Sequence, residues 1–305
     1  MRRTADTEYA LRNPEMTENQ AMNTTLVGRP TFAQNLSAAL AETRIKLVRM
    51  SRYPGQLVLD VIIPIVFAAM PMLLGRAGGN DAIANFQANT GTANYAAYLL
   101  IGSNVFMIVT MAFWTIAYWL RDEQETGTLE ALYLTPTASI TLISGVALYS
   151  AIRSVVSTLI AYSLGCLVFG VNPIQGDVLL ALMFILSGLI PLYALAMLFG
   201  ALVLKVKESN ALIGLIQWVI SFLMGVFFPV AVMPPALRFV ALLFPPTWMT
   251  NGVRSALLGV GFFFEKWYLD MAVLWVFLLF TPLFSLWVFR RVERGIRKNE
   301  GVGQF

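Results

Sequence analysis

The chain has 305 residues, of which 58% are hydrophobic and 12% charged, with a net charge of +4 and a mean hydropathy of +0.70. Because a soluble domain carries about 25% charged residues, this composition excludes an ordinary water-soluble protein and predicts an integral membrane protein. The basic residues lie beside apolar segments, which favours orientation in a membrane over binding of nucleic acid. The chain has no histidine and one cysteine, Cys166, so it lacks the commonest general base and cannot form an internal disulfide.

The first part of the chain is polar and then becomes amphipathic. Residues 1–35 mix Asn, Thr, Glu and Arg, which predicts a flexible cytoplasmic tail without a signal peptide. Over residues 36–52, apolar side chains recur every three or four positions among lysines and arginines. This spacing predicts a helix lying in the cytoplasmic membrane interface, with an ordinary soluble helix as the alternative. Pro54 and Gly55 predict a bend into the first span.

Six apolar segments follow, each close to the ~20 residues that a helix needs to cross ~30 Å of hydrocarbon. They run roughly over residues 57–75, 95–120, 140–169, 178–204, 211–232 and 269–289. We therefore expect an all-α membrane protein, with a six-span permease domain over residues 36–295 and a cytoplasmic tail at 296–305.

Lysine and arginine are distributed unevenly between the loops on the two sides. If both termini are inside, sixteen of the 21 basic residues fall on the cytoplasmic side and four outside, while Arg153 lies within the third segment. This bias predicts a multi-pass protein of the cell's inner membrane with both termini in the cytoplasm.

Two charged residues, Asp60 and Arg153, enter the first and third spans at similar depths. Because charges within spans seek partners, we expect these two side chains to form a structural pair. The alternative is that each side chain reaches the interface independently.

The chain lacks the motifs of an energy-converting or catalytic site. No Gly-x-x-x-x-Gly-Lys-Ser/Thr sequence is present to hold nucleotide phosphates, and without histidine there is no Ser-His-Asp triad or His-Glu-x-x-His zinc site. The spans also lack the chain of carboxylates that ion-coupled transporters use. We expect no catalytic residue, no metal site and no energy source within this polypeptide.

The segment between the second and third spans, residues 121–136, is short and acidic. Its acids are Asp122, Glu123, Glu125 and Glu130. Thr128 is suited to cap a short helix, with the apolar residues at 129, 132 and 133 on one face and Pro136 at its end. Such a helix suits docking into a cleft of a partner, and a solvated turn is the alternative.

The pattern Glu123-x-Glu125-x-Gly127-Thr128-Leu129-Glu130-x-Leu132-x-x-Thr135-Pro136 follows the second of six spans. It closely resembles the cytoplasmic loop of type-2 ATP-binding-cassette (ABC) exporter permeases, in the drug-efflux and nodulation lipo-oligosaccharide branch. The resemblance implies a coupling helix that sits in a groove of a cytoplasmic ATPase. The implied ATPase-coupling residues are Glu123, Glu125, Gly127, Thr128, Leu129, Glu130, Leu132, Tyr133 and Pro136.

The resemblance also implies an assembly. Two permease subunits, expected to be a homodimer, would enclose the substrate path, and two copies of a separate cassette ATPase would hold ATP and magnesium. The chain itself would bind no cofactor and would not be an enzyme; its other contacts would be membrane lipid and no nucleic acid. The expected function is ATP-driven export of a hydrophobic or amphipathic substrate, such as a drug, lipid or glycolipid. An ATP-independent scramblase or scaffold is the alternative.

The segment after the fifth span is too apolar for a solvated outer loop and is cut into short pieces by prolines. Its marked residues are Pro229, Pro234, Pro235, Pro245, Pro246, Trp248 and Arg254. We expect a re-entrant or interfacial helix pair on the outer side, one of whose helices covers residues 235–244. The prolines and the aromatic at Trp248 resemble the pattern that follows the fifth span of the same family.

Polar residues in the second and fifth spans are candidates to line the substrate path. They are Ser103, Asn104, Thr110, Gln217 and Ser221. The alternative is that these residues hold the helices to one another.

Overall fold

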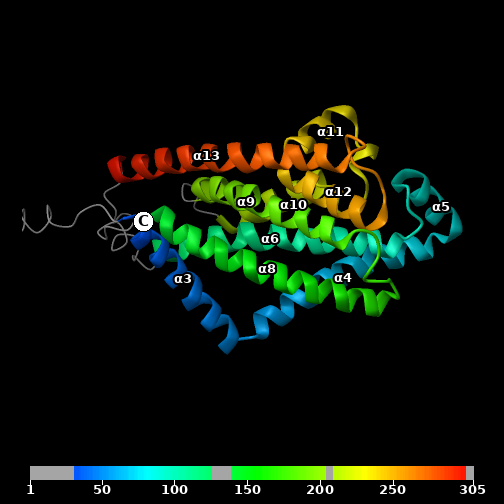
Figure 1. Ribbon diagram of the computed structural model, residues 1–305, viewed down its shortest axis with the longest axis horizontal. Coiled ribbons are helices and arrows are strands. Elements are labelled where there is room, and N and C mark those ends of the chain that lie inside the picture. Colours follow the sequence, from blue (N-terminus) through cyan, green and yellow to red (C-terminus); the bar gives the residue numbers. More distant parts are fainter. Residues whose placement is uncertain (1–30, 126–138, 204–208, 300–305) are drawn as a thin grey trace, which may run out of the picture.

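The computed structural model describes residues 31–125, 139–203 and 209–299, and within these ranges all regular structure is helical, which confirms the all-α prediction. In chain order the elements are α3 (Phe32–Arg52), α4 (Gly55–Ala77), α5 (Gly79–Thr90), α6 (Tyr95–Glu125), α8 (Ser139–Phe169), α9 (Val178–Val203), α10 (Ser209–Leu223), the 3-10 turn η1 (Val230–Val232), α11 (Pro235–Leu242), α12 (Pro245–Leu258) and α13 (Trp267–Asn299). The long helices α6, α8, α9 and α13 run side by side, and α3 and α4 form a V along one edge (Figure 1).

Five of the described helices are long and apolar enough to cross a membrane: α4, α6, α8, α9 and α13. They coincide with the first, second, third, fourth and sixth predicted segments. The apolar surface of α13 is mostly outside the protein core, since only 17% of its most apolar stretch is buried. Lipid covers such a surface in a multi-pass membrane protein.

The fifth predicted segment, 211–232, is wrong in its extent. Helix α10 ends at Leu223 and has 15 residues, which at 1.5 Å per residue is about 22 Å and short of the hydrocarbon thickness. The chain turns at Gly225, whose φ of 65° lies in the left-handed region, and Pro229 precedes η1. Apolar residues continue beyond Leu223, so a prediction from hydropathy alone placed the end of the span later than the end of the helix.

Helix α6 is the centre of the bundle, with 83% of its most apolar stretch buried. It contacts α4, α8, α9, α10 and α12. On α8, the small residues Ser150, Ser154 and Ser157 are all buried at helical spacing. Their small side chains let the backbones of α6 and α8 approach closely. Because α6 touches most of the other elements, its position determines the geometry of the sites described below.

Helix α3 begins with a capping box formed by Thr31 and Gln34 and packs against one end of α8. Thr43 Oγ1 donates to the Gly145 carbonyl oxygen at 2.9 Å, and the α3 backbone leaves no room for a side chain at Gly145. From this contact α3 diverges from α8, and the chain turns at residues 53–54 into α4 (Figure 1). We call this turn the elbow.

Candidate functional site

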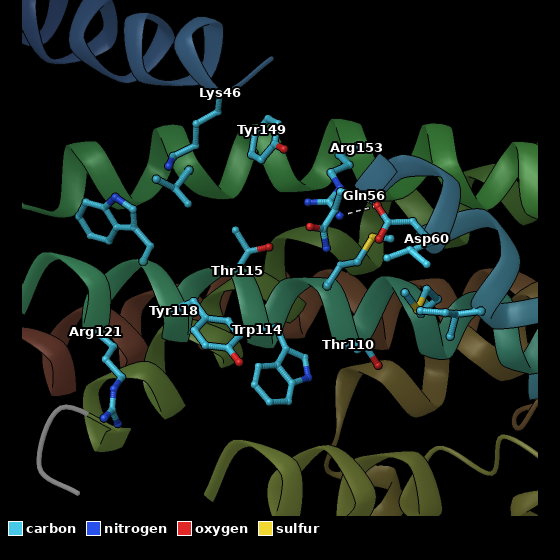
Figure 2. Close-up of a pocket in the computed structure, with 16 residues that line it drawn as sticks. Lys46, Gln56, Asp60, Thr110, Trp114, Thr115, Tyr118, Arg121, Tyr149 and Arg153 are labelled. Carbon is cyan, nitrogen blue, oxygen red and sulfur yellow. Dashed lines mark hydrogen bonds and ion pairs between the residues drawn. The ribbon is translucent and has the colours of Figure 1, made fainter. Parts of the chain in front are cut away.

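A cavity of about 800 Å³ lies inside the V formed by α3 and α4, with α6 and α8 as its other walls (Figure 2). We call it the elbow cavity. Its polar lining includes Lys46, Gln56, Asp60, Tyr149 and Arg153, and its apolar lining includes Leu59, Ile63, Met107, Trp114 and Trp119. The cavity therefore has a charged region around the Asp60–Arg153 pair, an apolar wall, and further polar side chains that include Arg121.

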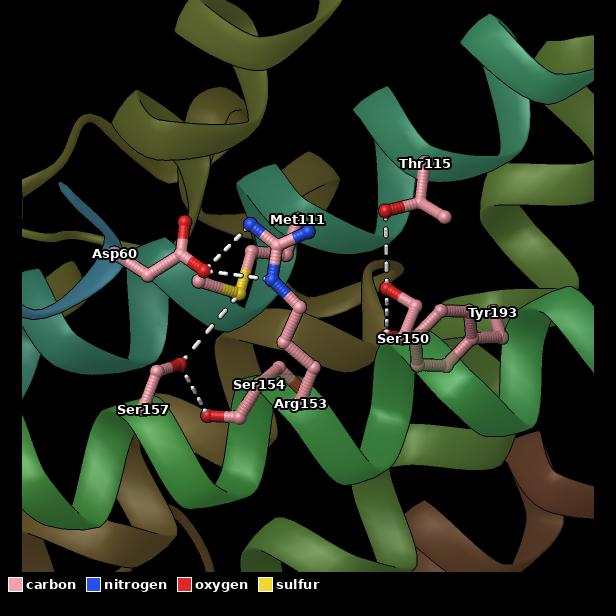
Figure 3. Close-up of polar contacts among 8 residues, drawn as sticks. All are labelled: Asp60, Met111, Thr115, Ser150, Arg153, Ser154, Ser157 and Tyr193. Carbon is pink, nitrogen blue, oxygen red and sulfur yellow. Dashed lines mark hydrogen bonds and ion pairs between the residues drawn. The ribbon is translucent and has the colours of Figure 1, made fainter. Parts of the chain in front are cut away.

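Asp60 and Arg153 form an ion pair that ties α4 to α8 at the cavity wall (Figure 3). Asp60 Oδ2 accepts from Arg153 Nε at 2.6 Å and contacts Nη2 at 2.5 Å. The carboxylate side chain is 4% exposed and the arginine side chain 14%. The structure thus brings together the two residues that the sequence suggested as a pair.

Beside this ion pair, hydroxyl groups link three helices (Figure 3). Tyr193 on α9 donates its hydroxyl to Ser150 Oγ on α8 at 2.8 Å, and Ser150 donates to Thr115 Oγ1 on α6 at 3.1 Å. Such bonds between helices fix their register in an apolar environment. Sequence reasoning did not single out these residues, although the spacing of the α8 serines was a usable signal.

Gln217 on α10 uses both ends of its amide to hold α6. Its Nε2 donates to Thr110 Oγ1 at 3.2 Å, and its Oε1 accepts from Trp114 Nε1 at 2.5 Å. Because this amide bonds two side chains of α6, the seam between α6 and α10 is a defined contact between helices. Thr110 and Trp114 also line the elbow cavity, so the seam adjoins it.

The other candidate path residues lie inside the helix packing. Ser103 and Asn104 are buried on α6, and both donate to the Leu100 carbonyl oxygen. Ser221 is buried on α10 and bonds the carbonyl oxygen of Trp218 in its own helix. Of the five candidates, Thr110 lines the elbow cavity and the other four are not in its lining.

Arg254 on α12 is 3% exposed and reaches across to the end of α10. Its Nη1 donates to the Gly225 carbonyl oxygen at 2.7 Å, its Nη2 to that of Val226, and its Nε to that of Tyr98 at 3.3 Å. The guanidinium carbon also lies 3.7 Å from the centre of the Tyr98 ring. The Arg254 side chain therefore provides hydrogen-bond donors for the carbonyl groups of Gly225 and Val226, just after α10 ends at Leu223.

This arrangement requires a glycine on α6. A side chain at Gly102 would collide with Arg254 Nη2 and with the Val226 carbonyl oxygen. The prediction placed Arg254 among the basic residues of the outer side, but its side chain is buried in the protein. The apolar residues around Arg254 could have indicated that its side chain is buried. From the sequence alone, they predicted only a re-entrant helix pair.

The prolines of this region begin helices, as their missing N–H groups favour. Pro235 starts α11 after Pro234, and Pro245 and Pro246 start α12. Trp248 Nε1 donates to the Leu242 carbonyl oxygen at 2.8 Å, which holds α12 against the end of α11. A pair of short helices thus occupies the predicted place, one of them close to the predicted residues 235–244.

The predicted ATPase-coupling residues lie at or beyond the end of α6. The backbone helix continues through Glu125, six residues or about 9 Å past the end of its apolar stretch at Trp119. Glu123 and Glu125 thus belong to the last part of this helix, and their side chains are outside the described structure. Gly127, Thr128, Leu129, Glu130, Leu132, Tyr133 and Pro136 also fall outside the described residues.

These features define a multi-pass helical membrane protein without a grouping of three or more metal-ligating side chains in its described part. The model of the ABC-2 family transporter protein matches residues 78–288, which is more than half of the chain. The chain belongs to the ABC-2 transporter family, a membrane component of transport that works with a partner ATPase subunit and is not itself catalytic. A comparison with curated proteins finds no match.

Proposed function

We propose that this chain is the membrane-spanning subunit of an ATP-driven exporter. It moves a hydrophobic or amphipathic substrate, such as a drug, lipid or glycolipid, out of the cytoplasm or inner leaflet, and a separate cassette ATPase supplies the energy. The supporting observation is that the most buried long helix, α6, runs directly into the acidic segment that resembles a coupling helix. Because this chain has no phosphate-binding loop, the proposal assigns ATP binding to the separate subunit and assigns the acidic segment to contact with that subunit.

Helix α6 is suited to carry motion from the ATPase into the membrane. A helix is stiff along its axis, and a displacement at Glu125 is passed to every element that α6 contacts. Hydroxyl links join α6 to α8, and the Gln217 seam joins it to α10. Closure of two ATPase subunits on ATP would then tilt these helices between two packed arrangements. Glu123 and Glu125 are the proposed contacts to the ATPase.

The proposed assembly has two copies of this chain and two ATPase subunits. Helices α4 and α10 present exposed apolar side chains on one side, including Val66, Met70, Leu215 and Trp218. The rings of Phe67 and Trp218, 6.5 Å apart, join the two helices into one surface. This surface is the proposed face toward the second copy, with the substrate path along the α6–α10 seam at Thr110 and Gln217.

The proposed topology has cytoplasmic termini, α3 in the cytoplasmic interface and a sixth crossing made by α10 with residues 224–234. Non-helical backbone is tolerated at membrane depth where protein covers it and satisfies its polar groups. The contacts of Arg254 with the carbonyl oxygens of Gly225 and Val226 meet that requirement. Helices α11 and α12 are the proposed re-entrant pair on the outer side.

The coupling role is tested with the partner cassette ATPase, co-expressed with this chain and purified in detergent. Glu125→Lys and Gly127→Trp should lower both ATPase retention and permease-dependent ATP hydrolysis at least tenfold. The control is Glu265→Lys, an exposed acid in the loop before α13, and it should behave as wild type. If both variants and a deletion of residues 128–132 retain coupled hydrolysis, the coupling role is wrong. Lipid scrambling by the permease alone would favour the ATP-independent alternative.

The topology is tested separately in a Cys166→Ser background. Single cysteines at Thr128 and Gly79 are treated with a membrane-impermeant thiol reagent applied from outside. The cysteine at position 79 should react and the cysteine at position 128 should be protected until the membrane is opened. The reverse pattern would overturn the orientation without bearing on the family.

A further inference from the structure

The elbow cavity continues into a second opening directly under the elbow. This second space is about 530 Å³ and is bounded by Arg49, Met50 and Tyr53 of α3. The two spaces share four lining residues, Lys46, Gln56, Tyr149 and Arg153 (Figure 2). We call these two adjoining spaces the channel; their linings extend from α3 to α6.

The shared end of this channel is rich in positive charge and hydrogen-bond donors. Lys46 and Arg153 line the shared end, Arg49 lines the adjoining second space, and Asp60 is the one acidic residue in the lining of either space. Tyr149 and Gln56 add a hydroxyl and an amide group. An anion with several acceptor oxygens, such as a phosphate ester, is the ligand that this donor set suits.

The existing ion pairs leave these cations able to bind an anion. Lys46 Nζ lies 3.4 Å from Glu42 Oε1 in a pair along the surface of α3, with both side chains more than a fifth exposed; such pairs contribute little to stability. Arg153 engages Asp60 through Nε and Nη2, both directed at the same oxygen, so Nη1 is outside that contact. The guanidinium can therefore hold Asp60 and face the channel at once.

Beyond the ion pair, the elbow cavity has an apolar wall as well as the polar residues Thr110, Thr115, Tyr118 and Arg121. Leu59 and Ile63 of α4 and Met107 of α6 line the elbow cavity beyond the ion pair. Ile45 and Val48 of α3 are exposed in a separate surface pocket that shares Arg49 and Tyr53 with the second space, which places the mouth of the channel next to lipid if α3 lies on the membrane. A free phosphate ion would leave this apolar wall uncovered, whereas an acyl chain would cover it.

We propose that the elbow cavity binds an anionic phospholipid from the leaflet that contacts α3. The phosphate lies among Lys46, Arg49 and Arg153, and one acyl chain lies along Leu59, Ile63 and Met107. The lipid is a bound ligand that joins α3 to α4 and α8, and it is separate from the transported substrate. The site does not depend on the ATPase or on the export cycle.

The test is a titration of the purified chain, in neutral detergent, with phosphatidylglycerol and with phosphatidylcholine, and bound lipid is counted by native mass spectrometry. Lys46→Gln with Arg49→Gln should weaken phosphatidylglycerol binding at least tenfold. The matched control is Arg44→Gln with Arg52→Gln, which removes the same charge from the same helix at positions outside both channel linings. The control should stay within twofold of wild type.

A second comparison guards against loss of folding in the double variant. The single changes Arg49→Gln and Arg52→Gln affect exposed side chains, and only Arg49→Gln should weaken binding, by about threefold or more. Equal weakening by both pairs would overturn the site in favour of general surface charge. Equal binding of the two lipids would overturn the anionic preference, and displacement by glycerol phosphate at the lipid's own concentration would show a soluble phosphate ester as the ligand instead.

Discussion

The ion pair between Asp60 and Arg153 can be tested by a double-mutant cycle. Asp60→Asn leaves the guanidinium without its carboxylate, and Arg153→Gln leaves a carboxylate that is 4% exposed without its cation. Removal of one partner of a buried pair costs about 3–5 kcal/mol. Because the Arg153 side chain is 14% exposed and has a flexible stem, we expect Asp60→Asn near the lower figure and Arg153→Gln near the higher one.

The double variant should cost no more than the worse single variant, because neither charge is then left alone. The coupling free energy is therefore expected to be about 3 kcal/mol, the size of the smaller single loss. Unfolding is followed by far-ultraviolet circular dichroism during titration of mixed micelles with a denaturing detergent. The exposed pair of Glu42 and Lys46, neutralised in the same way, is the control and should show a coupling of about 0.5 kcal/mol or less. Additive losses at Asp60 and Arg153 would refute the stabilising role of their contact.

Three further changes probe the packing around α12 and the loop before α13. Arg254→Met should cost about 2–6 kcal/mol, since the Gly225 and Val226 carbonyl groups would each lose a partner at about 1–3 kcal/mol; an unchanged denaturing midpoint would contradict this. Gly102→Ala should also lower the midpoint, because its methyl group would occupy the place of Arg254 Nη2, whereas alanine at the uncrowded Gly214 should be tolerated. The buried Asp270 carboxylate accepts from the Phe263 and Phe264 amides, and Asp270→Asn weakens this acceptor. A protease should then cleave within residues 259–266 in minutes. Cleavage at the wild-type rate would argue against this anchoring.

Most of the long helices could be predicted because hydropathy and length report directly on a span in lipid. The failure at α10 has a physical reason: the apolar run of residues 224–228 reflects burial inside the protein, which hydropathy does not distinguish from a helix in lipid. Helix α5 was not anticipated, because its sequence is largely polar and only Ile83 and Phe86 give it large apolar side chains. Its position depends on the edge contacts of Phe86 with the rings of Tyr95 and Tyr98.

The candidate site was accessible to sequence reasoning only in part. Asp60 and Arg153 could be suggested as partners because both charges enter the membrane at similar depths. The elbow cavity could not be predicted, because its volume depends on the angle at which α3 leaves α8 near Gly145. The alternative role of the polar path residues, holding helices together, fits the contacts of Gln217 with Thr110 and Trp114, whereas Ser103 and Asn104 bond a carbonyl oxygen of their own helix.

The buried guanidinium of Arg254 has a consequence for how the chain is built into the membrane. An arginine at the centre of an isolated helix costs about 2.5–3.5 kcal/mol on insertion, and α12 has only 14 residues. Its acceptors, the carbonyl groups of Tyr98, Gly225 and Val226, all precede it in the chain. When α12 leaves the ribosome, the carbonyl groups that hold Arg254 have already been synthesised, so docking of α12 onto α6 and the end of α10 can offset the cost of inserting its arginine.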